Sequence, residues 1–273
     1  MNEKISLAGD LGSGKSTVSA LLVEALGAEY YSTGAIVRSI AAKRGMTVVE
    51  LNVYMETHPE IDTEIDNGIA ALSAMDKPMI IDSRMAWHFT RGTFKVYLST
   101  DTETSALRIM TANRVGEHAA TLEETVAETR ARRESEKKRY RTQYGVNIKD
   151  LSNYSLVVDT TYATPPEIAE CILTAFAEWK ENPSHRAVLI SPDRFFYPDD
   201  EPNAALISEY SAALERGDTI PEVTAVEWDN EFYIISGAEA ALAHAFNFSS
   251  FVPTRLVDTE VDRTSYVKMK NSL

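Results

Sequence analysis

The sequence predicts an α/β protein, in which a parallel sheet flanked by helices is followed by a small α+β unit. Along residues 1–180, short apolar runs alternate with stretches of helical apolar spacing. Such alternation with short connections favours a parallel sheet with helices on both faces. After residue 186 the expected order is strand, helix, hairpin, helix and strand, which is typical of a compact α+β unit. We therefore expect two domains, 1–180 and 187–273, joined by a linker over 181–186.

The first element is a short buried strand through Ile5, Leu7 and Ala8, and it runs directly into a glycine-rich turn. The turn, Gly9-Asp10-Leu11-Gly12-Ser13-Gly14-Lys15-Ser16, fits the spacing G-x-x-x-x-G-K-[ST], and a helix is expected over 18–26. The glycines let successive backbone N–H groups point at phosphate oxygens, and the N-terminus of the helix favours the same anion. This order predicts a nucleoside triphosphate site. Its expected residues are Gly9, Gly12, Ser13, Gly14, Lys15, Ser16 and Thr17.

Two side chains of this loop have separate expected roles. The Lys15 ammonium group can reach the β- and γ-phosphates, and the Ser16 hydroxyl can bind Mg²⁺. ATP and Mg²⁺ are therefore the expected cofactors.

A strand over 29–32 and three helices are expected next. The first helix, 35–43, carries Arg38 near its start, and a capping box at Thr47–Glu50 opens the second. Ile61, Ile65, Ile69 and Leu72 share a face and predict a third, amphipathic helix. The acids Glu60, Asp62, Glu64 and Asp66 are expected mostly on its outer, solvated face.

Three further parallel strands are expected over 77–82, 94–98 and 155–159. Ligands gather at the carboxyl ends of the strands in open α/β sheets, so Asp82 and Arg84 are expected beside the phosphate loop. Asp82 could hold Mg²⁺ through water or cap a turn. The last helix of this half begins at a Thr164–Glu167 capping box and carries a core stripe. The stripe consists of Ile168, Ile172, Phe176 and Trp179.

Arginines are concentrated in one part of the chain, with seven between Arg108 and Arg141. Thr121-Leu-Glu-Glu124 predicts the start of a helix on which Arg132, Glu136 and Arg139 share a face. Surface ion pairs alone would explain that spacing. The density of arginines favours a lid that closes over a bound nucleotide, neutralises charge and excludes water.

Composition and charge exclude several classes of function. The 273 residues, 44% hydrophobic and 25% charged, are typical of a soluble globular protein. A net charge of −14 argues against nucleic-acid binding, and no apolar run approaches a membrane span. The single cysteine, Cys171, excludes an internal disulfide, and the N-terminus leaves no room for a signal peptide before the first strand. Together with the nucleotide site, these features predict a cytoplasmic protein.

The chain up to about Lys180 resembles the cytidylate kinases, especially the shorter cytidylate kinase-like branch of the nucleoside monophosphate kinases. The resemblance is carried by 9–17, Ser32-Thr-Gly34 with Arg38, Asp82-Ser-Arg84, 132–140, Tyr144-Gly145 and Asp159-Thr160. It implies transfer of the γ-phosphoryl group of ATP to a nucleoside monophosphate, with CMP or dCMP as the expected acceptor.

The resemblance also implies roles for individual residues. Ser32 and Arg38 would hold the acceptor monophosphate, with Asp82 beside them, and Arg84 would meet the acceptor base or phosphate. Arg132 and Arg139 would grip phosphates from the lid as catalytic residues, and Glu136 would take a sugar hydroxyl. Where the family often has glycine after the strand acid, this chain has Ser83.

Two other functions stay open at this point. A monophosphate attacks with an oxygen that is already anionic, so it needs arginines rather than a base. A kinase of a nucleoside or another small alcohol would instead need a base such as Asp82. An ATP-binding regulator whose C-terminal unit is the output is the third hypothesis. The set of arginines favours the monophosphate kinase over both.

The C-terminal unit has an expected element order that resembles the ParB-like, sulfiredoxin-like domain. Its strands are expected over 187–190, 223–228, 231–235 and 252–257, with helices from Asn203 to Gly217 and over 238–246. The resemblance is carried by Ile190-Ser-Pro192, Gly217 with Ile220-Pro221, Tyr233-Ile-Ile-Ser-Gly237 and Val252-Pro253.

This unit is not expected to bind phosphate. In nucleotide-using members of that family the glycine turn is followed by a polar residue and an arginine, but Gly237-Ala238-Glu239 supplies neither. Residues 181–273 also hold 7 Lys and Arg against 16 Asp and Glu, which disfavours DNA. We therefore expect a packing role and contacts with a second copy of the chain or with a protein partner.

Overall fold

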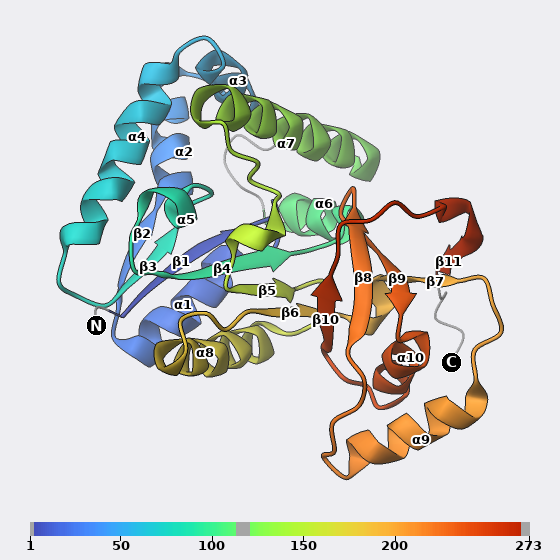
Figure 1. Ribbon diagram of the computed structural model, residues 1–273. Coiled ribbons are helices and arrows are strands. Elements are labelled where there is room, and N and C mark those ends of the chain that lie inside the picture. The colour runs from blue at the N-terminus through green and yellow to red at the C-terminus, as the bar shows by residue number, and fades with distance from the viewer. Residues whose placement is uncertain (1–2, 113–120, 269–273) are drawn as a thin grey trace.

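The computed structural model describes residues 3–112 and 121–268, which are built around one sheet of eleven strands (Figure 1). The strand order is β11-β7-β9-β8-β10-β6-β5-β4-β1-β3-β2. The strands are β1 (Lys4–Gly9), β2 (Glu29–Ser32), β3 (Met79–Asp82), β4 (Phe94–Ser99), β5 (Leu156–Asp159), β6 (Ala187–Ile190), β7 (Phe195–Pro198), β8 (Val223–Trp228), β9 (Glu231–Ser236), β10 (Val252–Leu256) and β11 (Tyr266–Lys268).

Helices cover both faces of the N-terminal part of this sheet. The helices are α1 (Lys15–Leu26), α2 (Thr33–Arg44), α3 (Val48–Met55), α4 (Pro59–Ala71), α5 (Ala86–Phe89), α6 (Thr102–Thr111), α7 (Leu122–Tyr144), α8 (Pro165–Glu181), α9 (Ala204–Glu215) and α10 (Ala238–Phe246). Figure 1 shows α1 and α8 together below the sheet, with α2, α3, α4, α5 and α7 above it. None of the described helices is both long and apolar enough to cross a bilayer.

Five of the first six strands are the parallel strands that the sequence predicts, and β6, which is expected in the C-terminal unit, adds a sixth parallel strand. β2, β3, β1, β4, β5 and β6 each run parallel to the next. A sheet covered on both faces needs strands that are apolar on both sides, and Leu7, Ile80, Ile81, Val157 and Val158 are all fully buried. The predicted fold class of this half is therefore confirmed.

Capping boxes start three of the helices that cover this sheet. The Thr47 hydroxyl accepts the N–H of Glu50, whose carboxylate accepts the N–H of Thr47, at the start of α3. Thr121 and Glu124 make the same exchange at the start of α7, and Thr164 and Glu167 form the box at the start of α8, so all three predicted caps are present. α7 then continues for 23 residues to Tyr144 and ends at Gly145, whose φ is 68°.

The C-terminal strands extend this sheet instead of forming a separate one. β6 is parallel to β5 on one side and antiparallel to β10 on the other. β8 and β9 form the predicted antiparallel hairpin, and the turn residues Asp229 and Asn230 have left-handed φ values of 48° and 70°. Positive φ at both turn positions suits a tight hairpin whose twist matches its strands.

The two predicted domains also share a hydrophobic core. One buried cluster contains Tyr97 and Tyr154 from the first half together with Phe195, Phe232 and Ile234 from the second. Removing apolar surface from water is the main favourable contribution to folding, so this shared cluster couples the two halves energetically. The halves are thus joined by a sheet and a core as well as by residues 181–186.

Candidate active site

The phosphate-binding loop connects β1 to α1, and its path depends on two glycines with positive φ. A Cβ atom on Gly9 (φ 152°) would lie 2.4 Å from the carbonyl oxygen of Leu98. A Cβ atom on Gly12 (φ 70°) would lie 2.5 Å from the carbonyl oxygen of Ser105. A side chain at either position would therefore displace the backbone. The loop is held closely against β4 and α6.

Lys15, the first residue of α1, reaches back over this loop. Its Nζ atom donates to the carbonyl oxygen of Gly9 at 3.2 Å and to that of Asp10 at 2.9 Å. Burial, followed by the nearby Arg84 guanidinium, lowers the pKa of Lys15 to about 8. The ammonium group thus lies beside the loop, and Lys15 lines a cavity there.

One cavity lies beside the loop. Its wall includes residues 12–16 of the loop together with Ser32, Arg38 and Asp82. The Ser32 hydroxyl accepts the N–H of Ala35 at 3.4 Å and so caps α2, which carries Arg38. Asp82, the last residue of β3, accepts a hydrogen bond of 2.9 Å from the Tyr30 hydroxyl. The carboxyl ends of β2 and β3 therefore bring these polar groups together, as expected for a parallel sheet.

The side chains of Ser16 and Asp82 fit the predicted magnesium site. Both line the cavity, and both offer the hard oxygen atoms that Mg²⁺ prefers. Mg²⁺ usually takes one or two protein groups and completes its shell with waters and substrate phosphates. Residues 3–112 and 121–268 contain no cluster of three or more His, Cys, Asp or Glu side chains that could hold a metal by themselves.

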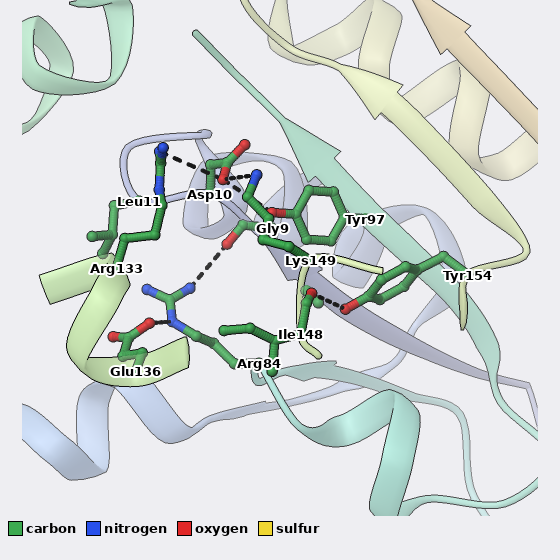
Figure 2. Close-up of a pocket in the computed structure, with 11 residues that line it drawn as sticks. Gly9, Asp10, Leu11, Arg84, Tyr97, Arg133, Glu136, Ile148, Lys149 and Tyr154 are labelled. Carbon is green, nitrogen blue, oxygen red and sulfur yellow. Dashed lines mark hydrogen bonds and ion pairs between the residues drawn. The ribbon is translucent and has the colours of Figure 1, made fainter. Parts of the chain in front are cut away.

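Helix α7 closes the cavity with a charged network centred on Glu136. Glu136 pairs with Arg84, and its Oε1 atom lies 3.2 Å from Nε of Arg132. Burial alone would raise the pKa of Glu136, but Arg84, Arg132 and Arg139 hold it below the usual range. Arg84 also donates to the carbonyl oxygen of Gly9 at 2.9 Å, so it links α7 to the phosphate loop (Figure 2).

Most of the predicted site residues line one cavity. Gly9 and Thr17 are not on its wall: Gly9 is buried behind the loop, and Thr17 is exposed on α1. Arg114, one of the seven clustered arginines, lies outside the described residues. The predicted residues on the wall are Gly12, Ser13, Gly14, Lys15, Ser16, Ser32, Arg38, Asp82, Arg84, Arg132, Glu136 and Arg139.

Two carboxylates of α4 also line this cavity, although the sequence pattern assigns them to the solvated face. Asp62 and Asp66 are only 3% and 6% exposed, so that expectation is wrong for both. Glu60 and Glu64 are exposed as expected. The pattern that could have identified the buried pair is their spacing of one helical turn, each directly after a residue of the apolar stripe.

Groups from α7 compensate the burial of these two acids. Nε of Arg139 lies 2.7 Å from Oδ2 of Asp62, and the same guanidinium donates to Asn52 on α3 at 3.2 Å. The Tyr144 hydroxyl donates to Asp66 at 2.6 Å. Burial raises the pKa of Asp66 to about 6, although this hydrogen bond opposes the rise. The cavity therefore has a cationic end, where Lys15, Arg84 and Arg132 lie near the phosphate loop, and a carboxylate end on α4, where Arg139 pairs with Asp62.

Comparison with known proteins shows which family the chain resembles. A family model described as an AAA domain matches residues 5–145. The cytidylate kinase of Thermoplasma acidophilum is 35% identical over 179 residues, which cover 64% of this chain and 93% of that protein. The cytidylate kinase of Archaeoglobus fulgidus is 34% identical over 173 residues, which cover 63% of this chain and 93% of the relative.

A solved structure with a similar arrangement is a shikimate kinase from Acinetobacter baumannii. Its TM-score is 0.44 at 19% sequence identity, and the match covers 66% of this chain and 96% of the neighbour.

Proposed function

Since the chain belongs to the cytidylate kinase family, whose members are ATP-dependent nucleoside monophosphate kinases, we propose that its acceptor is CMP or dCMP. The observation that carries this proposal is the polarity of the cavity. Five cationic side chains line the cavity, three of them (Lys15, Arg84 and Arg132) near the phosphate loop, and two buried carboxylates lie on the wall formed by α4. The cations are those of Lys15, Arg38, Arg84, Arg132 and Arg139.

The cationic end suits phosphoryl transfer between two anions. The transferred group spreads negative charge over its equatorial oxygens, so positioning and positive charge supply most of the catalysis. Lys15 and the loop N–H groups would hold the donor phosphates, and Arg38 would hold the acceptor phosphate. Arg132 and Arg139 would stabilise the charge that develops between them. Mg²⁺, held by Ser16 and Asp82, would neutralise charge on the donor phosphates.

The carboxylate end supports an acceptor base that donates hydrogen bonds. Cytosine presents its 4-amino group, a donor, where uracil presents a carbonyl oxygen, and carboxylates accept from that amino group. Asp62 is already paired with Arg139, whereas the described partner of the Asp66 carboxylate is a single hydroxyl. Asp66 is therefore the better candidate for reading the base.

The first experiment measures ADP release with ATP and Mg²⁺ against CMP, dCMP, UMP, AMP and GMP and the matching nucleosides. We expect CMP or dCMP to be preferred, and Lys15→Ala and Arg38→Ala to abolish turnover. Asp66→Asn should lower kcat/KM for CMP roughly 5- to 150-fold and affect UMP less, which is the range for one hydrogen-bonded base contact. Glu64→Gln, on the exposed face of the same helix, is the matched control and should behave as wild type.

Other outcomes would contradict this proposal in different ways. Preference for UMP or a purine monophosphate would leave the kinase and refute the cytosine assignment. Turnover with nucleosides alone would make Asp82 a general base. ATP binding without turnover of any acceptor would favour a regulator.

A further inference from the structure

Asn230, at the tip of the β8–β9 hairpin, connects the C-terminal strands to the phosphate loop. It is only 5% exposed, and its left-handed backbone turns the hairpin so that its side chain enters the N-terminal half. Its Nδ2 atom donates to the carbonyl oxygen of Thr100 at 2.7 Å, and its Oδ1 atom accepts from Lys149 at 3.2 Å. One amide group from the C-terminal half thus contacts two residues that surround the loop.

Thr100 and Lys149 are also the residues that hold Asp10, the second residue of the loop. The N–H of Thr100 donates to Oδ2 of Asp10 at 3.1 Å, and Nζ of Lys149 lies 2.7 Å from Oδ1. The Tyr97 hydroxyl adds a bond of 2.9 Å, and Arg133 lies 3.6 Å away (Figure 2). Asp10 is 4% exposed, so its carboxylate depends on these partners instead of water.

Because the Asp10 carboxylate is a buried ion, its position depends on the cationic groups that pair with it. Burial alone would raise the pKa of Asp10, but Lys149 and Arg133 hold it well below the usual range. A buried ion is costly when a partner is lost or misplaced. The group that orients Lys149 therefore affects the position of Asp10.

A second set of contacts runs from the same hairpin to Ser13 in the middle of the loop. Arg194, which follows β6 and is 3% exposed, donates to the carbonyl oxygen of Asn230 at 2.7 Å and to Asp159 at 2.6 Å. Asp159 ends β5, and the next residue, Thr160, donates from its hydroxyl to the carbonyl oxygen of Ser13 at 3.0 Å. The first set of contacts therefore reaches the loop at Asp10, and the second reaches it at Ser13.

We propose that Asn230 and Arg194 are positioning residues for ATP, through which the C-terminal half fixes the phosphate loop at Asp10 and Ser13. Neither residue lines the active-site cavity, so they act on the loop and not on the nucleotide. Preorganised N–H groups bind phosphate without a cost of rearrangement, and small displacements of such groups weaken binding and catalysis. The proposal requires only that the loop binds ATP and is independent of the acceptor.

The test is Asn230→Gly in the full chain, with Asp229→Gly as the matched control. Glycine tolerates the left-handed backbone at both turn positions, so the two variants perturb the turn similarly, and only Asn230→Gly removes the amide. Affinity for ATP with Mg²⁺ is measured by calorimetry, and the KM values for ATP and for the acceptor are measured separately. Thermal unfolding is followed in parallel.

We expect Asn230→Gly to weaken ATP binding roughly 3- to 30-fold, a typical range for coupling through such contacts. The KM for the acceptor at saturating ATP should stay at the wild-type value, and Asp229→Gly should bind ATP as wild type does. A double variant with Asp10→Asn should weaken ATP binding by less than the product of the two single effects, because both changes disrupt one network.

A lower Tm with unchanged ATP affinity in Asn230→Gly would overturn the proposal, since the hairpin would then be only a packing element. If Asn230→Gly does not fold, Asn230→Asp serves the same comparison. It sets an oxygen against the carbonyl of Thr100 and a second carboxylate beside Lys149 in competition with Asp10, so wild-type ATP affinity in that variant would also overturn the proposal. Failure of the cytosine assignment would leave calorimetric ATP binding untouched, so the two proposals can fail separately.

Discussion

Asp66 carries a proton to a higher pH in the folded protein than in the unfolded chain. Burial raises its pKa from 3.8 to about 6. Between these values the native state holds a proton that the unfolded state has released, so the free energy of unfolding falls as pH rises through this window. The contribution of Asp66 to stability is therefore fully present below pH 3.8 and lost above pH 6.

Asp66→Asn isolates this contribution because asparagine does not titrate. We expect the Tm of the variant, relative to wild type, to rise as the pH increases from 4 to 7, and the difference to level off above that. Thermal unfolding by circular dichroism at half-unit intervals of pH measures it. A difference in Tm that is the same at every pH would mean that Asp66 is not titrating in this range.

The burial of Asp62 and Asp66 could not be predicted from the pattern of their own helix. Every member of the phosphate-loop pattern is local, so the spacing of Gly9, Gly14 and Lys15 is sufficient to predict that part of the site. The two acids are buried because Arg139 and Tyr144 approach from a helix that is distant in sequence. The sequence pattern of α4 gives no information about contacts from α7, and isolated acidic side chains are normally solvated.

At the scale of elements, α7 places Arg132 and Arg139 on the wall of the cavity at the strand ends. Arg132→Ala removes a guanidinium beside Glu136 on the wall of the cavity. We expect kcat to fall about 100-fold or more, since removing one preorganised group that stabilises the transition state typically costs 10²–10³ in rate. Steady-state kinetics at saturating ATP and acceptor measures this loss.

Arg141→Ala is the matched control for this prediction, because Arg141 is an exposed residue of the same helix. It should retain wild-type kcat and a similar Tm. An equal loss in both variants would mean that the overall charge of α7 matters and that the position of Arg132 does not.

Elements with an apolar run or a repeated pattern were predictable, the four-residue strands β2, β3, β5 and β6 included, and elements without such a pattern were not. The parallel strands and α7 follow from apolar runs and capping residues in the sequence. The pattern does not predict α5, β7 or β11, which have only 4, 4 and 3 residues. β11 is defined by antiparallel pairing with β7, and β7 by parallel pairing with β9, so both depend on partners that the local sequence does not specify.

At the scale of the whole molecule, the shared core predicts that the two halves unfold together. Phe232 of β9 is fully buried in the cluster that also contains Tyr97 and Tyr154. Phe232→Ala should lower the free energy of unfolding by about 3–5 kcal/mol, the usual cost of removing a buried phenylalanine. Circular dichroism and tryptophan fluorescence should report one coincident transition in denaturant.

Phe248→Ala is the control, because Phe248 is 94% exposed and its removal should change stability by less than about 0.5 kcal/mol. Two separate transitions in wild type, of which Phe232→Ala shifts only one, would contradict the shared core. In that case the two predicted domains, 1–180 and 187–273, would be units that fold independently.

The pairing of β6 with both β5 and β10 has a consequence for the nascent chain on the ribosome. Translation delivers the phosphate loop before Asn230 and β10. Chains generally begin to fold from the N-terminus during synthesis, but the surface around Tyr97 and Tyr154 lacks its covering residues until the last strands emerge. A sheet closed by such late pairing has many contacts between distant residues, which slows folding. The loop that binds the nucleotide is therefore synthesised before the residues of the C-terminal half that we propose to fix it.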